Sequence, residues 1–196
     1  MEYQHASRGA VLAALLCAPA FAQAPAGATH YSIDQAKSSL EFSFVQAGAQ
    51  NKGKFTKFPV TLDASADGTS ASRLDVTVDM TTFDTDDKER NDTLKGPDLF
   101  DVAKFPQAHF VATQITKTAT GFDAVGKLTL RGVTRDLHVP FTLRATKEQG
   151  HAVTYLAGRT TVRRLDFGVG QGDWKSTEWV GNDVTVSYSV RLVAAQ

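Results

Sequence analysis

Apolar and polar residues alternate through most of this chain, and one segment, residues 83–110, breaks the alternation. Residues 73–80 show the pattern most clearly, because every second side chain there is apolar and those between are polar. A period of two is typical of a β-strand with one face against a core and the other in water. The pattern recurs between short turns, which predicts an antiparallel barrel or sandwich of roughly eight or nine strands.

The interrupting segment carries the signals of a short helix. Asp86 is the predicted N-cap, with Glu89 three residues further on as in a capping box, and Lys95-Gly96-Pro97 is typical of a helix end. We therefore expect a polar surface helix over residues 87–94, within a helical insertion at about residues 84–101. A sheet with a single helical interruption favours a barrel in which one segment is free to cover an opening.

The N-terminal residues are typical of a secretory signal peptide. Arg8 precedes an apolar run over residues 10–18, and small residues follow. This order predicts a signal peptide over residues 1–22, with cleavage after Ala22 or Ala24. The run is far shorter than the ~20 apolar residues that a membrane-spanning helix needs. The only cysteine, Cys17, lies inside the predicted signal, so the exported chain would contain no disulfide and would depend on its core alone.

The composition does not indicate a nucleic-acid partner, an enzyme or a metal site. The formal net charge is zero, whereas surfaces that bind nucleic acid are basic. The histidines are widely separated, and no nucleophile elbow or haem-attachment motif occurs. The length favours one domain. We therefore expect no catalytic residue, no metal ligand and no nucleic-acid partner.

The alternation leaves two interpretations of the barrel interior open. A barrel of about eight strands is just wide enough to be filled by side chains or to hold one elongated ligand. The predicted inward side chains are mostly Phe, Val and Leu, so either a packed apolar core or an apolar cavity fits them. A cavity would favour a lipid, because each buried methylene contributes about 0.8 kcal/mol.

Several segments, taken in order along the chain, resemble one known family. They are residues 38–42 with 53–55, 82–86, 92–101, 105–110, 126–134, 164–170 and 180–184. Together they are similar to the YceI-like polyisoprenoid-binding proteins, over a domain that we place at residues 29–195. The resemblance implies an all-β fold, an extended antiparallel lipocalin-like barrel of about eight strands. It also implies a bound polyisoprenoid or ubiquinone-like lipid in a long apolar channel, no required cofactor, and a periplasmic location.

The candidate ligand-binding residues combine the predicted inward faces with this resemblance, although each could equally be ordinary core. We expect the channel to be lined by Phe42, Phe44, Leu74, Val76, Val78, Phe110, Leu128, Leu130, Phe141, Tyr155, Val186 and Tyr188. Trp174 and Trp179 flank a short polar turn and are candidates for one mouth of the barrel, with packing at the barrel end as the alternative.

The expected function is non-enzymatic binding of a polyisoprenoid or isoprenoid quinone for transport or storage in the periplasm. One alternative is an accessory protein of a membrane b-type cytochrome and quinone system, because residues 168–174 resemble a branch of the family found beside such cytochromes. Another is a stress-related protein with a packed core. An outer-membrane barrel is disfavoured, because the aromatic residues are scattered and do not form girdles. Expected partners are the isoprenoid ligand, a membrane cytochrome or lipid-processing protein, and a second copy through free strand edges.

Overall fold

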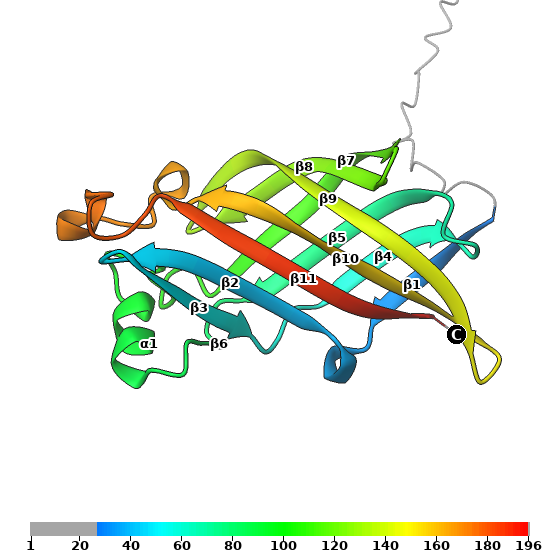
Figure 1. Cartoon of the computed structure of the whole chain (residues 1–196), viewed down its shortest axis with the longest axis horizontal. Coiled ribbons are helices and arrows are strands. Elements are labelled where there is room, and N and C mark those ends of the chain that lie inside the picture. The colour runs from blue at the N-terminus through cyan, green and yellow to red at the C-terminus, as the bar shows by residue number, and fades with distance from the viewer. Residues whose placement is uncertain (1–26, 196) are drawn as a thin grey trace, which may run out of the picture.

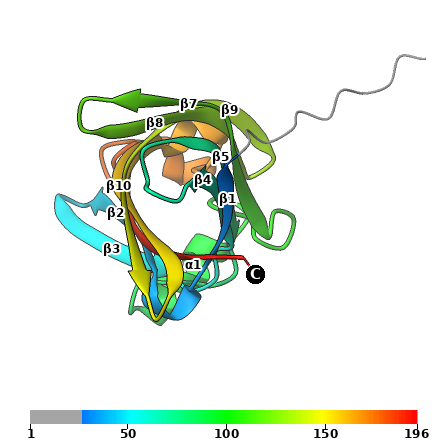
Figure 2. The same ribbon diagram turned by 90° about the vertical axis from the view of Figure 1, so that its right-hand side faces the viewer.

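The computed structural model describes residues 27–195, and the predicted signal peptide, residues 1–22, lies outside them. The described chain forms an elongated barrel of long, tilted strands (Figure 1). Viewed along that long axis, the strands surround the centre of the molecule (Figure 2). The prediction of an all-β barrel with a short helical insertion is confirmed.

Eight antiparallel strands form the closed ring of the barrel, and the pairing of the first strand with the last completes the ring. In spatial order they are β1 (Ala28–Ile33), β4 (Val60–Ser65), β5 (Ala71–Asp79), β7 (Gln107–Thr118), β8 (Gly121–Leu130), β9 (Val133–Glu148), β10 (His151–Arg163) and β11 (Asp183–Ala194). Every pairing in the ring is antiparallel, which agrees with the short turns in the sequence.

Three further strands extend the wall at one end of the barrel. They are β2 (Ser39–Gln46), β3 (Ala49–Phe55) and β6 (Phe83–Asp84), and they follow one another beyond β11 in the sheet. Strand β11 is long enough to pair with β1 through Leu192–Ala194 and with β2 through Thr185–Ser189. The 3-10 turn η1 (Gln35–Lys37) lies between β1 and β2.

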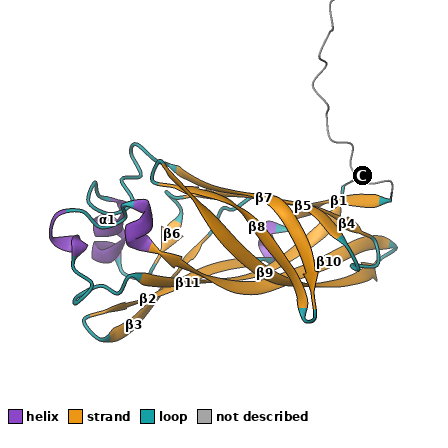
Figure 3. Ribbon diagram, turned by 90° about the horizontal axis from the view of Figure 1, so that it is seen from above, coloured by secondary structure: helices purple, strands orange, loops and turns teal. Residues whose placement is uncertain are grey.

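The helix α1 (Lys88–Lys95) lies at this same end, together with the 3-10 turns η2 (Arg164–Phe167) and η3 (Gly172–Lys175). Figure 3 shows these helical turns gathered beside the β2–β3 hairpin. We call this the helical end of the barrel. The chain termini of the described region lie toward the opposite end (Figure 1).

The start of α1 differs from the prediction by one residue. Asp87 is the N-cap, and its side chain accepts a hydrogen bond of 3.0 Å from the Arg90 amide. Asp86 cannot cap the helix because its φ is +57°, in the left-handed region, and its amide instead donates to the Asp84 carboxylate at 2.9 Å. The helix also ends one residue later than predicted, at Lys95, while the predicted glycine at the helix end, Gly96, is the C-cap.

The half of the barrel away from the helical end is packed with side chains. Tyr31, Leu62 and Leu192 are fully buried there. Phe122 of β8 stacks on Phe141 of β9, with ring centroids 5.3 Å apart and an interplanar angle of 18°. Both rings belong to the same cluster as the fully buried residues. We call this packed region the floor.

Candidate functional site

A cavity of about 660 Å³ occupies the barrel between the floor and the helical end. Inward-facing apolar side chains from nearly every strand line it, and aromatic rings cover one wall. Phe42 contacts Phe44, Phe55 and Phe83, with ring centroids 5.2 to 6.4 Å apart. Val186 packs against each of three hydrophobic clusters formed by residues 27–195, which places it near the middle of the cavity. The space can accommodate an apolar molecule but offers no pair of opposed charges deep inside for a charged one.

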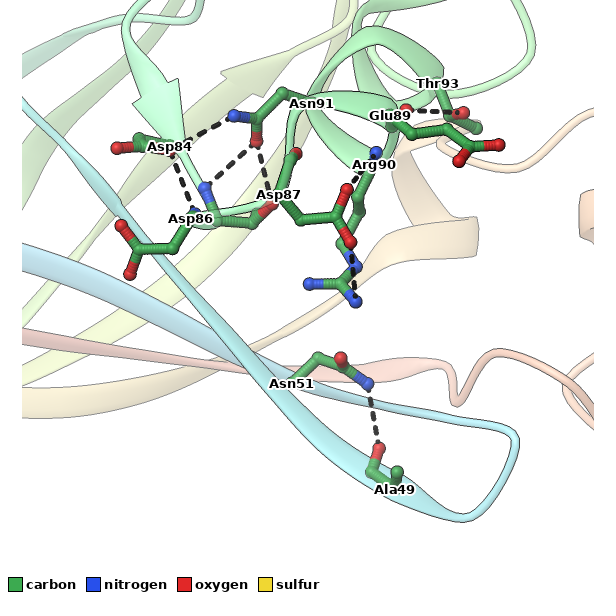
Figure 4. A network of polar contacts seen from close by, with 10 residues as sticks. Ala49, Asn51, Asp84, Asp86, Asp87, Glu89, Arg90, Asn91 and Thr93 are labelled. Carbon is green, nitrogen blue, oxygen red and sulfur yellow. Dashed lines mark hydrogen bonds and ion pairs between the residues drawn. The ribbon is translucent and has the colours of Figure 1, made fainter.

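The cavity reaches the surface between the β2–β3 hairpin and α1. Gln46, Ala47, Ala49 and Asn51 line it from the hairpin, and several of these residues are exposed. The facing lining residues from the helix region are Asp87, Glu89, Arg90 and Thr93. Figure 4 shows the Arg90 side chain extending from the helix toward the hairpin. We call this opening the mouth.

Short polar contacts hold α1 beside the mouth. The Asn91 side chain donates to the Asp84 carboxylate at 3.1 Å and accepts from the Thr85 hydroxyl at 2.8 Å, which ties the helix to the end of β6 (Figure 4). Arg90 forms an ion pair with Asp87 at 3.4 Å. Sequence reasoning missed these residues as part of the site. The signal that could have found them is a polar helix placed next to an apolar barrel, because such a helix has to cover an opening rather than join a core.

A buried arginine closes the cavity at the helical end. Arg164 is 4% exposed and lines the cavity. Its guanidinium donates five hydrogen bonds of 2.8 to 3.2 Å, all to backbone carbonyls, those of Val169, Trp174, Ser176, Val180 and Gly181. Burial lowers the pKa of this guanidinium. Since all five N–H groups are used, Arg164 fastens the segment 164–182 and has no donor left for a ligand.

Two side-chain hydroxyls in the lining also donate hydrogen bonds to backbone carbonyls. Tyr188 donates to the Pro140 carbonyl at 2.5 Å, and Thr160 donates to the His138 carbonyl at 2.7 Å. Burial, together with the charge of Asp123, raises the pKa of Tyr188 well above its usual value. The two hydroxyls therefore hold strands of the barrel wall together, and the surface that the cavity offers to a ligand is apolar.

Residues 31–192 match the family described as the YceI-like domain. The chain belongs to the YceI-like family. The protein YceI of Salmonella arizonae is 34% identical to it over 143 residues, which cover 70% of this chain and 69% of that protein. The crystal structure of BcnA from Burkholderia cenocepacia is 32% identical, with a TM-score of 0.73, and covers 83% of this chain and 99% of its own.

Two more distant structures show the same fold. The Campylobacter jejuni YceI protein is 20% identical with a TM-score of 0.70, covering 76% of this chain and 87% of its own. A domain from Saccharophagus degradans, described as polyisoprenoid binding and implicated in plant cell wall breakdown, is 16% identical with a TM-score of 0.59. It covers 84% of this chain and 98% of its own.

In this YceI-like barrel most of the candidate ligand-binding residues lie around the cavity. Those that line it are Phe42, Phe44, Leu74, Val76, Val78, Phe110, Leu128, Leu130, Trp174, Val186 and Tyr188. Trp174 lies at the helical end, on the turn η3. The structure thus brings together side chains from strands far apart in the sequence.

Three of the candidates do not line the cavity. Phe141 faces inward but belongs to the floor, where it stacks on Phe122. The inward assignment of Tyr155 is wrong, because its neighbour Leu156 lines the cavity and adjacent residues of a strand face opposite sides. On the outer side the Tyr155 hydroxyl donates to Glu148 at 2.8 Å. Trp179 lies at the helical end but is 69% exposed and outside the lining.

Three histidines on the outside of the barrel, His30, His109 and His138, are each paired with an aspartate on a neighbouring strand. His109 contacts Asp75 at 2.9 Å and His138 contacts Asp123 at 2.8 Å, and both imidazoles are largely exposed, as the alternation predicts. Within residues 27–195 no group of three or more His, Cys, Asp or Glu side chains could hold a metal ion. Helices in this part of the chain are too short or too polar to cross a membrane.

Proposed function

We propose that this protein binds a polyisoprenoid or an isoprenoid quinone, with the apolar chain in the cavity and the polar head at the mouth. The observation that supports this most directly is the apolar cavity of about 660 Å³, a size typical of small-molecule sites. Apart from Arg164, the charged and amide side chains of the lining lie where the cavity meets the surface. A long apolar molecule with one polar end matches that distribution.

The binding energy would come from burial of the chain. Each methylene removed from water contributes about 0.8 kcal/mol, so a few isoprene units give a substantial gross gain before the entropic costs of binding. The shared fold supports the same class of ligand, since the Saccharophagus degradans domain of this fold is described as polyisoprenoid binding. We infer a binding function rather than an enzymatic one, because the polar groups of the deeper lining, those of Thr160, Arg164 and Tyr188, donate to the protein's own backbone carbonyls.

We also propose that the protein acts in the periplasm. The support is the predicted signal peptide at residues 1–22, which resembles those that direct export. In an aqueous compartment, a water-insoluble lipid requires a protein that shields its chain. Transport or storage of the lipid would both follow from such shielding.

The first experiment is native mass spectrometry of the exported protein, purified from a periplasmic extract without detergent, with organic extraction of any bound molecule. A co-purifying isoprenoid would identify the ligand. An empty protein that also fails to take up added ubiquinone would contradict the proposal.

A pair of variants on one strand then locates the binding. Val186→Trp places a large ring in the middle of the cavity, and we expect at least about a tenfold loss of ubiquinone affinity, since overpacking removes the space for the chain. Ser187→Trp adds the same ring on the exposed outer face of β11 and should leave the affinity unchanged. Equal affinities in the two variants would show that the ligand binds elsewhere.

A further inference from the structure

The edge of the mouth carries the two large hydrophobic side chains that are exposed among the described residues. Trp179 is 69% exposed and Val45 is 41% exposed. Their segments are neighbours: the Ala47 amide donates to the Trp179 carbonyl at 2.7 Å, and the Gly181 amide donates to the Val45 carbonyl at 2.9 Å. Both segments lie at the helical end (Figure 1). Two exposed apolar side chains therefore occupy one place on the surface.

The cavity begins on the inner side of these two hydrogen-bonded segments. Gln46 pairs with Val180, and both residues line the cavity. Side chains alternate along a strand, so Val45, which precedes Gln46 in β2, faces outward. Trp179 precedes Val180, and neither Val45 nor Trp179 lines the cavity. These two side chains are therefore not part of the interior packing, and they lie on the surface directly outside the opening.

The hairpin beside them is uncharged. Residues 45–51, with the sequence VQAGAQN, contain no charged side chain, and residues 47–50 are exposed. Such a surface can be placed against lipid headgroups without removing a charge from water. The indole ring of tryptophan favours the boundary between headgroups and acyl chains, because it is apolar with one polar N–H group.

A protein partner fits these features less well. Stable protein–protein interfaces bury about 1,200–2,000 Å² of surface in total, far more than two exposed side chains and a small hairpin tip provide. A bilayer needs no complementary shape and accepts a small protruding apolar group. The observations therefore favour a lipid surface as the occupant.

We propose that the rim, formed by residues 45–51 and Trp179, docks the mouth of the cavity on the surface of a zwitterionic phospholipid bilayer. The inference rests on the proposed function for its purpose. An isoprenoid dissolved in the bilayer could then enter the cavity without crossing water, where each exposed methylene is unfavourable. The docking itself requires no isoprenoid, so it can be measured separately.

The test uses the exported protein and phosphatidylcholine vesicles that contain no isoprenoid, with brominated acyl chains as quenchers of tryptophan emission. Flotation measures the bound fraction, and quenching reports contact of an indole ring with lipid. Trp179→Ser should weaken vesicle binding by about tenfold or more, and Val45→Ser by less, because less apolar surface is lost. Trp179→Phe should keep most of the binding while the quenching is lost.

The matched control is Val111→Ser on β7, where Val111 faces outward because its neighbour Phe110 lines the cavity. This variant makes the same change as Val45→Ser away from the rim and should bind vesicles like the native protein. Native protein that does not bind vesicles, or a Trp179→Ser variant that binds equally well, would overturn the proposal. So would sedimentation data showing that Trp179 holds a dimer together and that the dimer does not bind vesicles.

A second readout separates this proposal from the proposed function. Binding of a short-chain ubiquinone in solution, without vesicles, should be the same in the native protein and in Trp179→Ser, because Trp179 lies outside the lining. If native protein binds vesicles but no ubiquinone, the proposed function fails and the docking stands. If it binds ubiquinone but no vesicles, the docking fails alone.

Discussion

The Tyr188 hydroxyl of β11 donates a hydrogen bond of 2.5 Å to the Pro140 carbonyl of β9, and its ring passes over Gly158 of the strand between them. The backbone ladder between β9 and β10 ends at the pair Phe141 and Gly158. Beyond that point Thr160 of β10 donates its hydroxyl to the His138 carbonyl. Side-chain hydroxyls therefore hold the wall of the cavity together where the two strands separate.

Removal of the Tyr188 hydroxyl should weaken the connection between β9 and β11. We expect Tyr188→Phe to lower the free energy of unfolding by about 1 kcal/mol, the usual net contribution of one hydrogen bond, and to speed ligand release. Denaturant unfolding and stopped-flow release of a bound quinone would measure the two effects.

The position of Gly158 provides the control for that variant. A Cβ at Gly158 would lie 2.3 Å from the Pro140 carbonyl oxygen and 2.7 Å from the Tyr188 ring, so Gly158→Ala must displace the same hydroxyl. The double variant should then lose less stability than the two single losses combined, because both changes break one contact. Simple additivity would mean that the hydrogen bond does not link the strands.

The stacked pair at the floor should set the depth of the cavity. Phe141→Ala removes one ring of the stack, and we expect the free energy of unfolding to fall by about 3–5 kcal/mol. The vacated space should also let the cavity take a longer isoprenoid chain. Affinities for a series of ubiquinones of increasing chain length would show the preferred length shift upward.

An equally buried ring at the other end provides the comparison. Phe83 and Phe141 are both 3% exposed, but Phe83 belongs to the cluster at the helical end. Phe83→Ala should cost similar stability without raising the preferred chain length. A shift of the same size in both variants would contradict the assignment of the floor.

The carbonyl contacts of Arg164 should make it essential for the segment 164–182. Arg164→Lys keeps the charge but cannot supply five donors, so we expect a loss of about 3 kcal/mol and faster proteolysis within that segment. Arg163→Lys is the matched control, because Arg163 is exposed and pairs only with Asp166 at the surface. That change should stay within about 0.5 kcal/mol. Resistance to proteolysis in Arg164→Lys would refute the role.

The network around Arg191 should make stability depend on acid pH. The hydrogen bond from Arg191, followed by that from Tyr155, holds the pKa of Glu148 below its ordinary value of 4.5. A lowered pKa contributes stability above 4.5, and this contribution is lost as the pH falls through the folded-state pKa.

Glu148→Gln should therefore show a smaller loss of melting temperature below pH 4.5 than the native protein. Tyr155→Phe, which removes the weaker of the two hydrogen bonds, should lie between them. Thermal melts from pH 7 down to pH 3 would measure this. Three coincident pH profiles would rule out the assignment.

The alternation predicted the inward faces well where one face is almost entirely polar, as in β5 and β11. It failed in β10, because apolar residues occur on both faces there: Val153, Tyr155 and Ala157 on one, and Leu156 and Val162 on the other. Which face of β10 points inward is decided by contacts with distant segments. Gly158 has to face inward under Tyr188, and Tyr155 reaches Glu148 on the outside. No local pattern carries that information.

The question of a packed or a hollow barrel could not be answered from periodicity. Each interpretation is correct for one half of the molecule. Whether a region is packed or hollow depends on which side chains from different strands lie at the same level along the barrel axis. The stack of Phe122 on Phe141 joins two strands at one level, which spacing within a strand does not reveal. The sequence suggested a helical segment that could cover an opening, but it did not show that the hairpin lies opposite, since Asn51 and Arg90 are far apart in the chain.

The floor has a consequence for how the protein can be used repeatedly. Tyr31, Leu62 and Leu192 bury one another without help from any guest molecule, so that half of the barrel keeps its shape when the other half is vacant. A barrel that packed together only around a bound ligand would lose its structure when the ligand is released and would have to refold before binding another. Under the proposed function, folding and ligand binding would therefore be separate events, and the same molecule could release one ligand and bind another.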